Sequence, residues 1–168
     1  AGEPFQSFPY AMMRYGDGGV GGWGSMCGVV NGGAALIGLF HGEKSKETRE
    51  ALITDLCVWY ETTSLPAFKP AEPLWAEQAE PCVAGSLLCH VSVAEWCKAT
   101  GLSAFCMEKK ERCRRLATDG VIKVVEILNR KAEEEACEFA PLTPDVKACI
   151  DCHGKNEPGD AVGKMRCA

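Results

Sequence analysis

Cysteine is the residue that most constrains this chain, because it occupies 11 of the 168 positions. Small secreted domains stapled by disulfides are usually shorter and denser in cysteine, whereas ordinary cytosolic enzymes contain far fewer. An odd number also means that the cysteines cannot all pair with one another within one chain. We therefore expect the function to depend on the cysteines.

The remaining composition is that of one compact globular domain, with 46% hydrophobic and 24% charged residues. A net charge of −5 argues against a nucleic-acid partner. The most apolar stretch, residues 26–40, is shorter than the ~20 residues needed to cross a bilayer, so we expect a buried helix and no membrane span. The start Ala1-Gly2-Glu3-Pro4 has neither a basic region nor an apolar run, as expected of an exported chain whose signal peptide has been removed.

The hydrophobic pattern predicts a mainly α fold, because no alternating run is long enough for a sheet. A glycine-rich loop at 16–24 leads into the apolar helix, where Gly28, Gly32 and Gly33 would permit close packing. Ser45 can cap a helix that runs to about Glu61. Residues 65–81 are rich in proline and predict an extended segment.

The longest periodic stretch, about residues 108–135, predicts an amphipathic helix with one apolar and one charged face. The face expected to be buried comprises Cys113, Leu116, Ala117, Val121, Val124 and Leu128. The opposite, outward face comprises Arg112, Arg115, Lys123 and Glu126. Thr143-Pro144 is typical of a helix start, and we expect the chain from Cys149 onward to be rich in loops. The predicted organisation is a helical, cysteine-rich domain at 1–140 with a C-terminal segment at 141–168 packed on it.

The strongest motif is the C-x-x-C-H sequence formed by Cys149, Cys152 and His153. In c-type cytochromes two such thiols bind haem covalently, and the adjacent imidazole is an axial ligand of the iron. The alternatives are a small disulfide loop or half of a zinc site. Zinc would need a second ligand pair, and no other C-x-x-C occurs in the sequence. The motif therefore favours haem c, which is attached outside the cytoplasm, and predicts a periplasmic or other extracytoplasmic location.

A second axial ligand could come from either of the two other histidines or from a methionine. His90 is the first candidate and His41, at the end of the apolar helix, is the second; Met165 is the third. Ligation by two histidines would favour electron transfer, whereas an open site would permit small-molecule chemistry.

Nine cysteines remain after the two haem thiols are set aside. Five of them lie close together in the sequence: Cys82, Cys89, Cys97, Cys106 and Cys113. Four thiolates could hold an iron–sulfur cluster, and four thiols could equally form two disulfides in an oxidising compartment. The spacing leaves both alternatives open.

Two stretches of the chain resemble a known family. Residues 18–28, running on to Leu39-Phe40-His41-Gly42, are similar to the signature of the C_GCAxxG_C_C redox proteins. Residues 85–98, followed by Glu111-Arg112-Cys113, resemble the later cysteines of that family. With its haem motif, the chain looks most like the split-Soret cytochrome c branch.

The resemblance implies a helical, homodimeric, periplasmic electron carrier with bis-histidine haem and a two-iron, two-sulfur (2Fe–2S) centre. Carried over, Cys27, Cys89 and Cys113 match the family cysteines, Cys97 is the candidate fourth cluster ligand, and His90 lies in the matching Cys-His-x-Ser-Val stretch. Two departures matter. The family's first cysteine, expected near residues 11–13, is absent, and Cys167 supplies only the first cysteine of the second C-x-x-C-H that these cytochromes carry. We expect either a chain that continues further or a one-haem variant.

The sequence thus favours a c-type cytochrome that exchanges electrons with redox partner proteins, with a basic partner surface favoured by its negative charge. One alternative is a haem-dependent enzyme acting on a small sulfur or nitrogen species. Another is an extracellular binding module without haem, whose cysteines are all disulfides.

Overall fold

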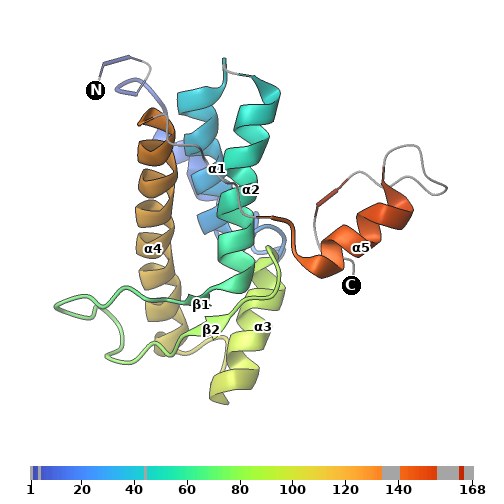
Figure 1. The fold of residues 1–168 in the computed structure, drawn as a ribbon. Coiled ribbons are helices and arrows are strands. Elements are labelled where there is room, and N and C mark those ends of the chain that lie inside the picture. Colours follow the sequence, from blue (N-terminus) through green and yellow to red (C-terminus); the bar gives the residue numbers. More distant parts are fainter. Residues whose placement is uncertain (1, 4, 44, 134–140, 155–162, 165–168) are drawn as a thin grey trace.

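In the computed structural model the chain is mainly helical, as predicted (Figure 1). The structure describes residues 2–3, 5–43, 45–133, 141–154 and 163–164. Met165, Cys137 and Cys167 lie outside these ranges. The described helices are the 3-10 helix η1 (Tyr10–Gly16), α1 (Gly28–His41), α2 (Lys46–Thr62), α3 (Cys89–Thr100), α4 (Met107–Ala132) and α5 (Pro144–His153). Two short strands, β1 (Ser64–Leu65) and β2 (Cys82–Val83), pair antiparallel with Leu65 opposite Cys82.

Helices α1, α2 and α4 pack against one another and form the main body (Figure 1). Their contact depends on Gly33, where an added Cβ would lie 2.7 Å from Leu56 Cδ2 and 3.0 Å from Val124 Cγ2. The predicted packing role is confirmed for Gly33, whereas Gly32 faces open space. The core at this contact consists of Ile37, Leu52, Leu56, Val124 and Ile127.

Helix α2 begins where its sequence predicted. The Ser45 hydroxyl accepts a hydrogen bond from the Thr48 N–H at 3.1 Å, which satisfies one of the free donors of the first turn. The C-terminal end of α2 leads directly into β1, which places Tyr60 in a second core with Cys27, Val30, Leu65, Ala84, Leu87 and Leu116.

The predicted faces of α4 are correct in part: Leu116 and Val124 are buried and Glu126 is exposed, as expected, but other positions differ. Arg112 and Arg115 are buried, whereas Val121 is 59% exposed. For Arg115 the reason lies in the extended segment at 66–81, whose backbone has almost no regular pairing of its own, whereas Arg112 binds Ser92 of α3. Acidic and basic side chains of α4 supply the partners that this backbone needs.

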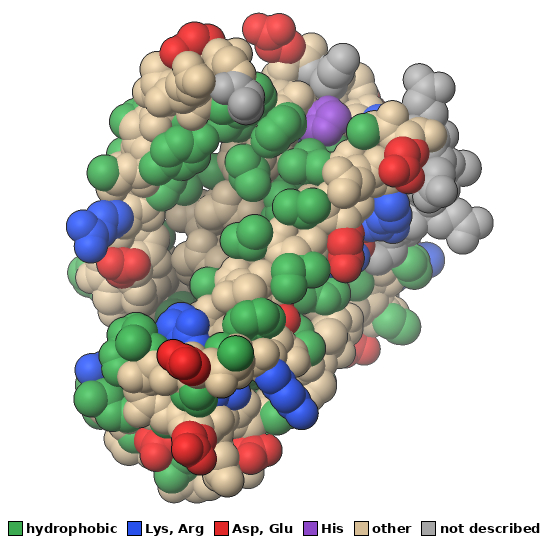
Figure 2. All heavy atoms as spheres, turned by 90° about the vertical axis from the view of Figure 1, so that its left-hand side faces the viewer, with side chains coloured by type: hydrophobic (Ala, Val, Ile, Leu, Met, Phe, Trp, Pro, Cys, Tyr) green, Lys and Arg blue, Asp and Glu red, His purple; other side chains and the backbone are tan. Residues whose placement is uncertain are grey.

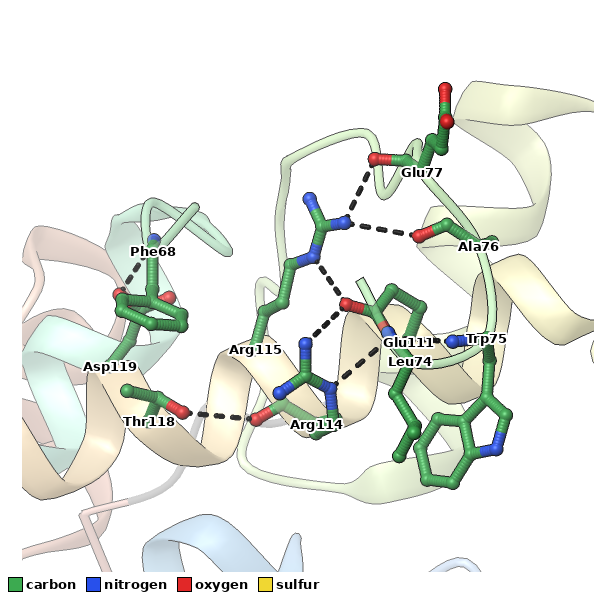
Figure 3. A network of polar contacts seen from close by, with 10 residues as sticks. All are labelled: Phe68, Leu74, Trp75, Ala76, Glu77, Glu111, Arg114, Arg115, Thr118 and Asp119. Carbon is green, nitrogen blue, oxygen red and sulfur yellow. Dashed lines mark hydrogen bonds and ion pairs between the residues drawn. The ribbon is translucent and has the colours of Figure 1, made fainter. Parts of the chain in front are cut away.

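Figure 3 shows these contacts, apart from that of Ala67. The Asp119 carboxylate accepts hydrogen bonds from the N–H groups of Ala67 and Phe68, both at 2.9 Å. Glu111 accepts from the N–H groups of Leu74 and Trp75 and pairs with Arg114 and Arg115. Arg115 in turn donates to the carbonyls of Ala76 and Glu77. The α4 side chains therefore supply the hydrogen-bond partners that a neighbouring strand would otherwise provide for this segment.

The C-terminal region also differs from the prediction, because residues 149–153 are helical rather than loop. Helix α5 lies beside the main body (Figure 1), with Val146 only 2% exposed. Leu142 and Lys164 from this region line a cavity of about 350 Å³ together with residues of α2. The described part of the C-terminal segment thus contacts the helical domain.

The surface carries charges of both signs. On the face shown in Figure 2, acidic and basic side chains are interspersed among hydrophobic ones, without a patch of a single sign. Within the described ranges no helix combines the length and the apolar character that crossing a membrane requires.

Candidate functional site

The haem motif lies on the last turn and a half of α5. Thr143 precedes the helix and Pro144 is its first residue, as the sequence predicted. Cys149 is half-buried, whereas Cys152 and His153 are exposed. A spacing of three residues places both thiols on the same side of one helical turn. The donor set therefore fits a covalently attached haem, because both thiols and the imidazole belong to one accessible helix.

Of the two candidate histidines for the second axial position, one lies at the start of a helix and the other at the end of a helix. His90 is the second residue of α3 and is exposed, whereas His41 is the last residue of α1 and is half-buried. An exposed imidazole can reach a ligand without displacing core side chains. The structure therefore keeps His90 as the more accessible candidate, and the third candidate, Met165, lies outside the described residues.

Three of the four predicted cluster cysteines lie near one another. Cys27 precedes α1, Cys89 begins α3, and Cys113 lies in the second turn of α4. Burial raises the pKa of the Cys89 thiol, and the nearby thiols of Cys27 and Cys113 raise it further. Burial also raises the pKa of Cys113, although Arg112 and Lys109 oppose this effect. Three elements distant in sequence thus bring three thiols within electrostatic range of one another.

The fourth predicted cysteine, Cys97, occupies a different place. It lies eight residues beyond Cys89 on α3, which corresponds to about 12 Å along the helix axis. In the described part of the chain, no three histidine, cysteine or carboxylate side chains form a group that could hold a metal ion. The described cysteines are present as free thiols. Cys27, Cys89 and Cys113, called the thiol group below, therefore lie near one another but do not form a complete set of metal ligands in this structure.

A buried arginine, which sequence reasoning missed, lies next to this thiol group. Arg112 is 1% exposed, donates to Ser92 Oγ at 3.0 Å and approaches Cys82 Sγ at 3.9 Å. Its Nε has no hydrogen-bond partner among the described residues, and the ion pairs found there do not include it. A buried cation is costly unless an anion or several acceptors compensate it. The donor chemistry therefore suits an anionic group, such as a metal-bound thiolate, at this place.

Tyr60 completes the polar contacts around Ser92. Its hydroxyl donates to Ser92 Oγ at 3.1 Å, and burial raises the pKa of this phenol well above its ordinary value. Ser92 Oγ thus accepts hydrogen bonds from both Tyr60 and Arg112 in the interior. Its position three residues after Cys89 in the Cys-His-x-Ser stretch was the only sequence signal of this role.

Cys57 was left unassigned by the sequence and lies apart from the thiol group, in the wall of the cavity between α2 and Leu142. Burial, followed by the nearby Glu61, raises its pKa from 9.0 to about 11. This thiol is therefore almost entirely protonated at neutral pH and is a poor nucleophile and metal ligand.

The fold and these residues define a helical, cysteine-rich redox protein. The comparison with family models makes this specific: residues 6–127 match the model described as "Putative redox-active protein (C_GCAxxG_C_C)", and the chain belongs to that family. This confirms the resemblance found in its motifs.

One curated relative is the split-Soret cytochrome c of Desulfovibrio desulfuricans, 35% identical over 172 aligned positions. The alignment covers 99% of this chain but only 61% of that protein. Among solved structures, one described as "A novel iron centre in the split-Soret cytochrome c" from the same organism superposes with a TM-score of 0.88 at 32% identity. That match covers 99% of this chain and 70% of the solved one. The chain is thus similar to a cytochrome whose solved structure is described as showing a novel iron centre.

Proposed function

We propose that this chain is a periplasmic c-type cytochrome that carries electrons between partner proteins. The observation that carries the proposal is the placement of Cys149, Cys152 and His153 on one exposed helix, in a chain similar to split-Soret cytochrome c. Bound haem c would supply a one-electron couple at its iron. Cys149 and Cys152 would hold the group covalently, and His153 would be one axial ligand.

The chain's own contacts fix the helix that presents this motif. Val146 anchors α5 with 2% exposure, and Lys147 pairs with Asp151 at 3.2 Å on the outer side. Lys164 reaches Thr54 Oγ1 at 3.4 Å and ties the following segment to α2. The segment 141–168 would therefore act as a haem-bearing unit held on the domain at 1–140.

In the same proposal His90 would be the second ligand of the haem iron, with His41 as the alternative. His90 is supported by its exposure and by its place in the Cys-His-x-Ser-Val stretch. Coordination by two histidines would leave no open position at the iron, which suits an electron carrier better than a catalyst.

The test of this function is the binding of carbon monoxide to the reduced protein. We expect the parent protein to bind carbon monoxide poorly and His90→Ala to bind it readily, with His41→Ala as the matched control. Ready binding by the parent would overturn the carrier proposal and favour an enzyme acting on a small sulfur or nitrogen species. Equal behaviour of the two variants would show that His90 is not the ligand.

The thiol group is proposed as a second redox site. Cys27, Cys89 and Cys113 would hold a 2Fe–2S centre, with Cys97 as the predicted fourth ligand and disulfides as the alternative. Arg112 would compensate the negative charge of thiolates there. Substituting Cys113 with Ser should abolish acid-labile sulfide while leaving haem content unchanged, whereas Cys57→Ser should leave both unchanged. Sulfide retained in Cys113→Ser, or absent from the parent protein, would contradict this assignment.

A homodimer is part of the proposal. It is supported by the apolar side chains that α4 leaves exposed at Val121, Ile122 and Val125, at 59%, 46% and 46%. Light scattering coupled to size exclusion should give twice the chain mass. A monomer at micromolar concentration would contradict it.

A further inference from the structure

The glycine-rich loop at 16–24 has an unusual backbone. Six of its residues have positive φ angles between 61° and 86°: Gly18, Gly19, Val20, Gly21, Gly22 and Gly24. Glycine adopts this conformation without the steric penalty that a Cβ brings. Hydrogen bonds within the loop, such as Gly24 N–H to Gly18 O at 2.9 Å and Ser25 N–H to Gly19 O at 3.0 Å, hold it in one shape. The loop is thus a defined structure rather than a loose connection.

This loop ends on the first turn of α3. The Cys89 N–H donates to Ser25 O at 2.7 Å, and the His90 N–H donates to Gly24 O at 3.0 Å. The first N–H groups of a helix have no carbonyl partner within the helix. The loop therefore supplies the acceptors that fix the start of α3, where a predicted cluster ligand and a predicted haem ligand are consecutive residues.

Gly24 lies directly against His90, as Gly19 lies against Cys89. A Cβ at this position would lie 2.8 Å from His90 Cβ and 3.6 Å from the His90 backbone nitrogen. A side chain at residue 24 would push the loop and His90 apart and so strain the hydrogen bond between them. Gly21 and Gly22, in contrast, have similarly positive φ angles but no atom within 4 Å of an added Cβ.

We propose that Gly24 is a positioning residue for His90. Its missing side chain lets the loop seat directly against the histidine and sets the direction from which the imidazole approaches the haem iron. The haem part of this inference rests on the ligation proposed above, whereas the positioning of His90 follows from the contacts themselves. Gly24 does not touch the iron and acts only through His90.

The first experiment compares Gly24→Ala with Gly21→Ala by hydrogen exchange followed by mass spectrometry on the purified protein. Both variants place a Cβ on a left-handed residue and share that backbone strain, but only the first collides with His90. We expect amide exchange at Cys89 and His90 to become about tenfold faster in Gly24→Ala, as when one hydrogen bond is lost, and to stay unchanged in Gly21→Ala. Equal exchange in the two variants would overturn the proposal.

The second experiment measures the visible spectrum and the midpoint potential of the same two variants. Gly24→Ala should keep covalent haem but shift the potential and weaken the second axial bond, seen as faster carbon monoxide binding, while Gly21→Ala matches the parent. Identical potentials and binding rates in the two variants would refute a role at the haem. If His90→Ala leaves the parent spectrum unchanged, the ligation itself is wrong, and the exchange comparison still decides whether Gly24 positions α3.

A double variant keeps the test decisive if Gly24→Ala alone does not fold. Replacing His90 by Gly removes the Cβ with which residue 24 would collide. We expect Gly24→Ala to change the unfolding equilibrium constant at least tenfold less in the His90→Gly background than in the parent. Equal effects in both backgrounds would show that the 2.8 Å approach is not what constrains position 24.

Discussion

Replacing Ser92 by alanine should destabilise the protein more than any other exchange of a single hydroxyl. Ser92 is 1% exposed, and its Oγ accepts hydrogen bonds from Arg112 Nη2 at 3.0 Å and Tyr60 OH at 3.1 Å. In Ser92→Ala both donors lose this acceptor in the interior. The cost is about 1.5–3 kcal/mol for the charged donor and about 1–3 kcal/mol for the phenol.

The phenol can turn toward the neighbouring Cys27 thiol, which brings the expected total to about 2–5 kcal/mol. For a chain of this length that corresponds to a fall in Tm of roughly 4–20 °C. The assay is urea and thermal unfolding of the reduced protein, followed by far-UV circular dichroism. The matched control is Ser103→Ala, since Ser103 is exposed and its hydroxyl serves only the Phe105 N–H in the described contacts; this variant should change stability by less than about 0.5 kcal/mol.

A Ser92→Ala protein as stable as the Ser103→Ala control would refute the reasoning. It would mean that Arg112 and Tyr60 find equally good partners elsewhere, and that the interior beside the thiol group is not organised around Ser92.

Three further predictions concern groups in other parts of the fold. Burial and Glu61 raise the pKa of Cys57 from 9.0 to about 11. Its alkylation by iodoacetamide at pH 8, measured by peptide mass spectrometry, should therefore be about 100-fold slower than in the urea-unfolded protein. A difference in rate below threefold would contradict this. Hydrogen bonds from Arg114, together with those from Arg115 and the Trp75 N–H, lower the pKa of Glu111 from 4.5 to about 2. The contribution of Glu111 to stability is therefore fully present above about pH 4.5 and is lost as the pH falls through about 2. Glu111→Gln should flatten the acid-unfolding profile between these two pH values. An unchanged profile would contradict this prediction. Asp119→Ala leaves the N–H groups of Ala67 and Phe68 without acceptors and should lower the free energy of unfolding by about 2–4 kcal/mol, measured by urea unfolding. Asp119→Asn should lower it by about half as much. Equal losses in the two variants would show that charge, rather than hydrogen bonding, is the cause.

The sequence was sufficient for those parts of the fold in which local rules decide. The Ser45 cap, the apolar helix α1, the extended proline-rich segment and the packing role of Gly33 all follow from residue type and spacing. The pattern of α4 was correct for Leu116 and Val124 but wrong for its arginines, because it assumes that charged side chains face water. Arg115, Glu111 and Asp119 are buried, since a segment some 40 residues earlier in the chain has backbone groups that need hydrogen-bond partners, and no local pattern in α4 indicates such a need.

The candidate site also contains some features that local sequence predicts and others that depend on distant segments. The haem motif is contiguous and could be predicted from five residues, although its helical conformation could not, because the glycines and proline after it suggested a loop. The gathering of Cys27, Cys89 and Cys113 depends on three separate elements and was expected only from the family resemblance. Arg112 beside these thiols could not have been expected from spacing, because its neighbours Ser92 and Cys82 come from α3 and β2.

The covalent attachment of haem, measured on one purified sample, tests most directly the central claim that this chain is a c-type cytochrome. After acid–acetone extraction of any loosely held haem, the pyridine haemochrome spectrum should show haem retained by the polypeptide. Intact mass should rise by the mass of the haem, and both signals should vanish when Cys149 and Cys152 are replaced by Ser. A polypeptide of unmodified mass without a haemochrome signal, obtained from an expression host that attaches haem c to a control cytochrome, would contradict the account.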